Sequence, residues 1–270
     1  AYLRNGLFEE LRDTVILTER TFQNGNTRHG LIFAVDLERY DYNRGSQSLI
    51  RATEGTVADR LPPRVRIRER AGLELPHIML LIDDREKTVI EPLAEKTDTL
   101  PRAYSSELMM QGGRIRGWKV SDENDIYNMA RALLKLADTD LFRTRYHVGG
   151  KYGVLLFAVG DGNHSLAAAK ACWENLKKTL GPNASAGHPA RYALVEVVNV
   201  HDKGLVFEPI HRVLFNVGRE RLISAFYDYY TQKGCKVHVL PDSESRPACR
   251  RASHSPSGCG YPSEFSGSLS

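Results

Sequence analysis

Short apolar runs separated by turn-forming residues dominate the first hundred positions, and this pattern predicts β-strands. Residues 15–22 and residues 31–35 are two such runs. The Asn-Gly-Asn segment at 24–26 lies between them and predicts a tight hairpin, because asparagine and glycine adopt positive φ at little cost. We therefore expect residues 1–100 to form a β-rich part with mainly antiparallel strands.

Other segments of this part carry weaker patterns. Apolar runs at 78–82 and 88–90 flank a polar turn and predict a second hairpin. The run at 64–68 alternates arginine with valine and isoleucine, which predicts an edge strand with one solvated face. A short helix is expected at 5–13.

Residues 101–240 combine helical and strand patterns. The apolar run at 153–160 is bounded by glycines and predicts a strand buried on both faces. Helical spacing at 164–178 and another apolar run at 192–198 follow. Strand, helix and strand at this length predict a right-handed βαβ crossover, so the expected fold class is mixed α/β. Two more helices are expected, one capped by Ser121 and one at 218–231.

Residues 241–270 are rich in serine, proline and glycine, and they show almost no apolar periodicity. Such a segment buries too little apolar surface to offset the entropy of ordering it. We therefore expect a disordered tail. An out-of-frame extension on a truncated chain is the alternative.

Composition narrows the class of protein. Hydrophobic residues make up 41% of the chain and charged residues 26%, which is ordinary for a globular protein. The net charge of +4 is too small to indicate a nucleic-acid partner. No apolar run is long enough to cross a membrane, and no signal peptide is recognisable. The cysteines show no zinc spacing, and Cys172 and Cys235 are expected in the core, so a cytoplasmic protein is expected.

The sharpest functional pattern is the turn Asp161-Gly162-Asn163-His164-Ser165 between a predicted strand and a predicted helix. Free N–H groups and the positive end of the dipole at a helix start favour phosphate or carboxylate. Gly162 lets the backbone approach a ligand closely, and His164 holds or shuttles a proton near neutral pH. Asn163 and Ser165 add short hydrogen-bonding groups. A plain loop with Asp161 or Asn163 as helix cap is the alternative.

A second polar segment, residues 51–60, places Arg51, Arg60, Glu54 and Thr56 around a glycine. Guanidinium groups suit phosphate oxygens. Glu54 suits a general base if it lies near a substrate hydroxyl. A solvated loop with an internal arginine–glutamate pair explains the segment equally well.

Two further histidine-containing segments are weaker candidates. His211 and Arg212 follow a strand expected at 205–207 and are candidate ligands at the same sheet edge. His201 and Asp202 resemble half a metal site, but no spacing completes it, so the metal stays unassigned.

The turn and its flanking strand resemble the hallmark segment of an uncharacterised bacterial family, the domain of unknown function 1015 family. Other blocks resemble this family in the same order and extend the resemblance over residues 1–240. They are Arg51-Ala52-Thr53-Glu54-Gly55-Thr56, Leu75-Pro76-His77-Ile78-Met79, Gly112-Gly113-Arg114-Ile115-Arg116-Gly117-Trp118 and Pro209-Ile210-His211-Arg212.

Family members often carry Asp-Gly-His-His-Arg at this turn. That pattern is similar to the phosphate-binding motif of the ParB and sulfiredoxin superfamily, which includes kinases of free serine. In this chain Asn163 replaces a histidine and Ser165 replaces the arginine. The resemblance implies a site that grips a nucleotide phosphate, with Arg51, Arg60 or Arg212 supplying the missing charge.

The leading hypothesis is a protein that binds a phosphorylated small molecule or a nucleotide, with Mg²⁺ as an allowed cofactor held by Asp161. Phosphoryl transfer on a small hydroxylated metabolite such as serine would use Glu54 or His164 as base. The alternative is a ParB-like regulatory module in which a nucleotide controls contact with DNA or a partner. A hydrolase using His164 or His211 is a third hypothesis.

Overall fold

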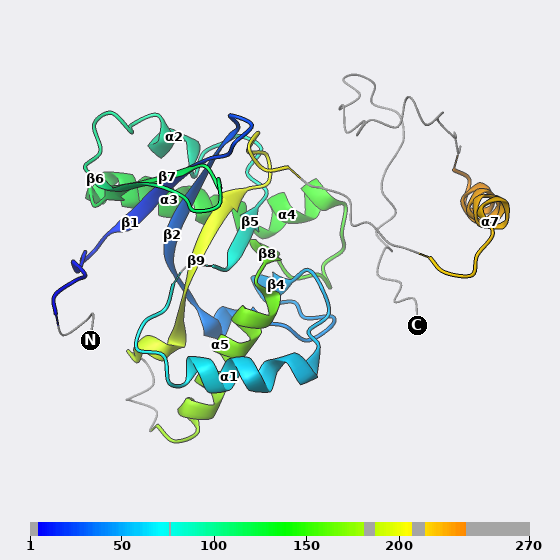
Figure 1. The fold of residues 1–270 in the computed structure, drawn as a ribbon, viewed down its shortest axis with the longest axis horizontal. Helices are drawn as coiled ribbons and strands as arrows, with labels where there is room; N and C mark the ends of the chain where they lie inside the picture. Colours follow the sequence, from blue (N-terminus) through cyan, green and yellow to red (C-terminus); the bar gives the residue numbers. More distant parts are fainter. Residues whose placement is uncertain (1–4, 76, 181–186, 207–213, 236–270) are drawn as a thin grey trace. The chain divides into compact units, whose positions relative to one another are not determined.

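The computed structural model describes residues 5–75, 77–180, 187–206 and 214–235 (Figure 1). Residues 1–208 form one compact unit and residues 209–270 a second. The described part of the second unit contains helix α7, Arg219–Gln232, which confirms the helix expected at 218–231. The predicted tail, His211 and Arg212 lie outside the described residues.

Nine strands in the described residues of the first unit form one mixed sheet, in the order β3-β4-β8-β5-β9-β2-β1-β7-β6 (Figure 1). Strands from both sides of residue 100 interleave in this sheet. The mixed α/β class is therefore confirmed. The strands are β1 (Val15–Thr21), β2 (Thr27–Asp36), β3 (Tyr40–Asp41), β4 (Ile50–Ala52), β5 (Met79–Ile82), β6 (Arg102–Glu107), β7 (Arg114–Val120), β8 (Phe157–Asp161) and β9 (Tyr192–Asn199).

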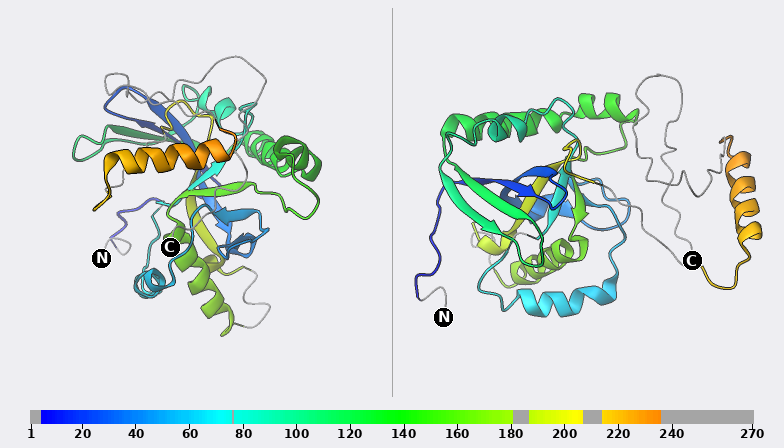
Figure 2. Two further views of the ribbon diagram at one scale, coloured as in Figure 1. Left: turned by 90° about the vertical axis from the view of Figure 1, so that its right-hand side faces the viewer. Right: turned by 45° about the horizontal axis from the view of Figure 1, so that its top comes forward.

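The helices connect these strands, and α1 lies beside α5 in both views of Figure 2. The helix expected after Ser121 is confirmed as α3, although its N-cap is Asp122, whose carboxylate accepts the N–H groups of Asn124 and Asp125. The helices of the first unit are α1 (Leu61–Arg68), α2 (Glu91–Ala94), α3 (Glu123–Leu136), α4 (Thr139–Tyr146) and α5 (Asn163–Lys177), with 3-10 turns η1 (Leu37–Arg39), η2 (Ala58–Arg60) and η3 (Pro189–Arg191).

One face of the sheet forms the core. Laterally paired residues on neighbouring strands make a fully buried row across it, and α3 and α5 add Met129, Leu166 and Trp173 to the same cluster. On the opposite face Ile16 and Ile32 are half-buried, whereas Thr18 and Val198 are buried. The buried row is Leu17, Leu31, Val197, Leu80 and Val159.

The hairpin at 24–26 is confirmed, with β1 and β2 antiparallel and Gly25 at a φ of 79°. The second hairpin is wrong. Strand β5 already has β8 on one side and β9 on the other, so residues 88–90 have no free edge to join. Instead the Asp84 carboxylate accepts the N–H groups of Thr88 at 2.6 Å and Val89 at 2.8 Å, and these bonds close a loop.

Two local predictions in the first hundred residues are also wrong. Residues 64–68 belong to helix α1, because Pro62 and Pro63 preset its first turn and arginine favours a helix. The segment 5–13 is irregular. Its Leu7 and Phe8 side chains are exposed, and a short helix without such packing is marginal in water.

The strand–helix–strand order of β8, α5 and β9 is confirmed, but a parallel crossover is wrong. Strand β5 lies between them, antiparallel to β8 and parallel to β9, so β8 and β9 run in opposite directions. The apolar pattern contains no information on strand direction. The strand at 153–160 begins only at Phe157, and Cys235 is exposed instead of buried.

Candidate functional site

The turn after β8 joins the sheet to α5 through a glycine in the left-handed region. Gly162 is the N-cap of α5 and has a φ of +83°. A Cβ at this position would lie 3.1 Å from the Cα of Ile78, which is completely buried. Only glycine therefore combines this backbone conformation with this close approach to the chain before β5.

The start of α5 has no side-chain cap. The Gly162 carbonyl accepts the N–H groups of Ser165 and Leu166, both at 2.9 Å, and the Asp161 carboxylate accepts the Gly162 N–H at 2.7 Å. Among the described residues, no side chain caps the N–H groups of the first turn. The N–H groups of Asn163 and His164 lack an acceptor within the helix, as at the start of any α-helix. Together with the helix dipole they favour an anion.

An open pocket of about 290 Å³ lies at this helix start. Its lining combines two carboxylates, two imidazoles and one guanidinium with the polar groups of the turn. The lining residues are Glu54, Arg64, His77, Asp161, Gly162, Asn163, His164 and Ser165. The structure thus brings Glu54 from the second predicted segment to the Asp161–Ser165 turn, which begins 107 positions later in the chain.

Asn163 positions the loop after β4. It is 4% exposed, and its Oδ1 accepts the N–H of Thr53 at 3.2 Å. Its Nδ2 donates to the Thr53 hydroxyl at 3.3 Å and to the Val159 carbonyl at 3.4 Å. The Thr53 hydroxyl also donates to the Val159 carbonyl at 2.5 Å. These bonds use the Asn163 amide, so its side chain holds the two site segments together.

His164 makes a second link to the same loop. Its Nε2 accepts the backbone N–H of Val57 at 3.2 Å, so in the neutral ring the proton is on Nδ1. Nδ1 lies 3.8 Å from a carboxylate oxygen of Glu54. The His164 side chain is 11% exposed, whereas that of Glu54 is 62% exposed. Glu54 is therefore the more accessible of the two candidate bases.

Three other predicted ligands do not line the pocket. Arg51 donates to the carbonyls of Ser48 and Gly153, at 2.8 Å and 2.5 Å, and burial lowers its pKa. These bonds tie the loop before β8 to β4. The Thr56 hydroxyl is buried without a hydrogen-bond partner in the described part of the chain. Arg60 is exposed at the start of α1.

Sequence reasoning missed Arg64, His77 and Thr53. Arg64 was placed on an edge strand, although the two prolines before it indicate the helix start that turns it toward α5. His77 enters the pocket because β5 pairs with β8, with Met79 opposite Asp161. That pairing is not visible in either segment alone.

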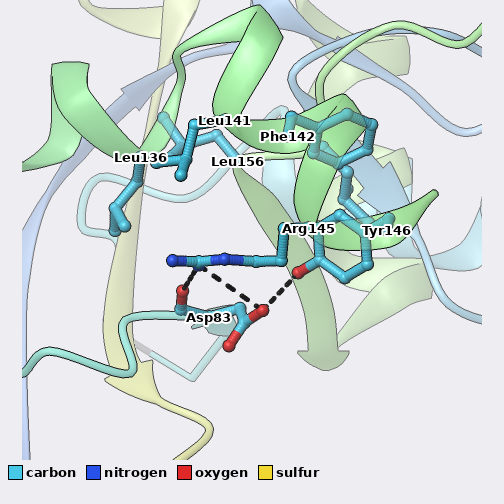
Figure 3. Close-up of a pocket in the computed structure, with 8 residues that line it drawn as sticks. Asp83, Leu136, Leu141, Phe142, Arg145, Tyr146 and Leu156 are labelled. Atoms are coloured by element: carbon cyan, nitrogen blue, oxygen red, sulfur yellow. Dashed lines mark hydrogen bonds and ion pairs between the residues drawn. The ribbon is translucent and has the colours of Figure 1, made fainter. Parts of the chain in front are cut away.

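A second polar cluster surrounds Asp83 at the end of β5 (Figure 3). Its carboxylate accepts the Tyr146 hydroxyl at 2.5 Å and lies 2.6 Å from Nε2 of His201. Arg145 donates to the Asp83 carbonyl at 2.6 Å. The adjoining cavity, of about 10 Å³, has room for about one water molecule. We interpret this cluster as a clasp between α4 and the sheet.

The environment of Asp83 changes two pKa values. Burial opposes ionisation of this carboxyl, but the hydrogen bonds from Tyr146 and His201 and the positive charges of Arg145 and Arg85 together hold the pKa of Asp83 below its usual value. Burial, followed by the hydrogen bond to Asp83, raises the pKa of Tyr146 to about 12. His201 is thus paired with Asp83, and Asp202 accepts the N–H groups of His29 and Gly204.

Among the described residues, no three histidine, cysteine, aspartate or glutamate side chains converge on a common metal position. Within the same residues, no helix has the length and apolarity to span a membrane.

The fold and site define a mixed α/β protein with a polar pocket at an uncapped helix start. A family model described as protein of unknown function (DUF1015) matches residues 1–256. The chain therefore belongs to this family, as its sequence motifs predict. No curated protein and no solved structure matches the chain.

Proposed function

We propose that the pocket at the start of α5 binds the phosphate group of a small-molecule ligand or nucleotide. The observation that carries this proposal is the uncapped helix start, with its free N–H groups at Asn163 and His164, on an open pocket that Arg64 also lines. The similarity of the Asp161–Ser165 turn to the phosphate-binding turn of the ParB and sulfiredoxin superfamily supports the same ligand.

The charges of the lining are consistent with a phosphate bound together with Mg²⁺. Asp161 and Glu54 would repel a bare anion, whereas Mg²⁺ in phosphoryl-transfer sites is commonly held by one or two carboxylates and the phosphates of the substrate. When bound, the ion would neutralise charge on the phosphate. Arg64 and the N–H groups of α5 would hold the remaining phosphate oxygens.

The reaction proposed is phosphoryl transfer to or from a small hydroxylated metabolite such as serine. In the forward direction, Glu54 accepts the proton of the hydroxyl and the oxygen attacks the terminal phosphorus of a nucleoside triphosphate. The bond from that phosphorus to its bridging oxygen breaks, and the nucleoside diphosphate leaves with the electron pair. Because Nε2 of His164 accepts the Val57 N–H, we assign His164 to holding the loop and Glu54 to the base. Positioning and charge neutralisation supply most of the catalysis.

A ParB-like regulatory module is the second candidate. One observation favours it: α1 and its flanks carry five arginines between residues 60 and 70. Fluorescence anisotropy with duplex DNA, with and without nucleotide, tests it. Nucleotide-dependent DNA binding without phosphoryl transfer would favour the module over the enzyme.

The proposal is tested by calorimetric titration with inorganic phosphate, phosphoserine, and ADP or ATP with Mg²⁺. At least one should bind, and His164→Asn should weaken that binding by about tenfold or more, because it removes the Nε2 acceptor of the Val57 N–H and releases the loop that carries Glu54. The matched control is His147→Asn at the exposed C-cap of α4, where asparagine tolerates the φ of 53°.

Circular dichroism should show that both variants are folded. The proposal fails if none of these probes binds the folded protein. It also fails if His164→Asn and His147→Asn have the same affinity as the unmodified chain.

A further inference from the structure

Two arginines lie at the start of α1, Arg60 just before the helix and Arg64 in its first turn. Arg64 lines the pocket, and its Nη1 donates to the Arg60 carbonyl at 2.9 Å, which holds the guanidinium against the helix. Arg60 precedes α1 with helical dihedral angles, φ −84° and ψ −12°. Residues four apart lie on one face of a helix, so the Arg60 and Arg64 side chains are neighbours.

Neither arginine is paired with an acid. No carboxylate among the described residues forms an ion pair with Arg60 or Arg64, and both residues are exposed. The next arginine on this face, Arg68, is neutralised by Glu74, whose carboxylate lies 2.5 Å from its Nη1. Two adjacent unpaired guanidiniums therefore remain, one lining the pocket and one a helical turn away.

The position of α1 is set by packing. It lies against α5, and Cys172 of α5 contacts the Val65 carbonyl, with 3.8 Å between sulfur and oxygen. The helix that carries the two arginines is therefore held beside the helix whose start forms the pocket. This packing keeps Arg64 at the helix start.

We propose that this site selects ligands with two directly linked phosphates, such as diphosphates, over single phosphates. The inference rests on the proposed function. One phosphate occupies the start of α5 and contacts Arg64. The second lies outside the pocket against Arg60, because a guanidinium fork binds phosphate oxygens in a bidentate manner.

The experiment compares inorganic phosphate with pyrophosphate by calorimetric titration in the presence of Mg²⁺ at equal ionic strength. The unmodified chain should bind pyrophosphate at least about tenfold more tightly than phosphate, as one added charge-assisted contact implies. Arg60→Gln should remove most of this preference and change phosphate affinity less than about twofold. Arg64→Gln should weaken the binding of both phosphate and pyrophosphate.

Arg66→Gln is the matched control. It removes the same charge from the same exposed helix, but residue 66 is about 200° around the helix from residue 64. This variant should keep the preference for pyrophosphate. Equal effects of Arg60→Gln and Arg66→Gln would overturn the inference, because the preference would then reflect overall charge.

Failure of the diphosphate inference is distinguishable from failure of the proposed function. If phosphate binds, depends on His164, and is bound as tightly as pyrophosphate, the proposed function stands and the diphosphate inference is wrong. If neither phosphate nor pyrophosphate binds the folded protein, both are wrong.

Discussion

Replacing Gly162 with alanine should destabilise the first unit more than replacing Gly45 or Gly55 with alanine. An L-residue at a φ of +83° costs about 1–2 kcal/mol relative to glycine. The added Cβ would also lie 3.1 Å from the Cα of Ile78 and 3.2 Å from its Cγ1. Because Ile78 is buried in the core, relief of this contact adds about 1 kcal/mol. The expected loss is therefore about 2–3 kcal/mol.

Substitutions at two other glycines separate the cost of the positive φ from the cost of the contact with Ile78. Gly45 has a φ of +82° but nothing within 4 Å of its added Cβ, so Gly45→Ala should cost only the backbone contribution of about 1–2 kcal/mol. Gly55 has neither positive φ nor a neighbour within 4 Å, so Gly55→Ala should be within about 0.5 kcal/mol of the unmodified chain. Urea denaturation followed by circular dichroism measures all three. If Gly162→Ala costs no more than Gly45→Ala, the approach to Ile78 does not constrain the turn and this reasoning is refuted.

Two other substitutions test the links around the site and the clasp. Asn163→Leu should lower the free energy of unfolding in urea denaturation by about 1–3 kcal/mol, because it removes the hydrogen bonds of the buried Asn163 amide to Thr53 and to the Val159 carbonyl. An unchanged stability would contradict the positioning role. Asp83→Asn should destabilise the chain at neutral pH. The folded pKa of Asp83 is lowered, so its contribution is present above the unfolded value of about 3.9 and is lost as pH falls through the folded value. Denaturation at pH 7 and near pH 3 should thus show that the difference in free energy of unfolding between the two proteins becomes smaller in acid. A difference that does not change with pH would contradict a stabilising role of the ionised Asp83 carboxylate.

Local sequence patterns were sufficient to predict the structure of segments whose conformation depends on their own residues. The Asn-Gly-Asn hairpin follows from residues that accept positive φ, and α3 follows from apolar spacing, although its cap is Asp122 and not the predicted Ser121. The Asp161–Ser165 turn was found because a glycine and four polar residues follow an apolar strand. Such features are encoded within a few neighbouring residues, so the sequence alone was enough to predict them.

Tertiary structure decided what depends on distant partners. Strand direction was one such feature: β5 inserts between β8 and β9, which rules out the parallel crossover and leaves residues 88–90 without a free edge. The roles of Arg51 and Asn163 were another, because each type of side chain serves equally well as a ligand or as a bond between segments. Only the packing of α1 on α5 and of β5 beside β8 brought Arg64 and His77 to the helix start, since hydrogen bonding and burial between remote segments leave no periodic trace in the chain.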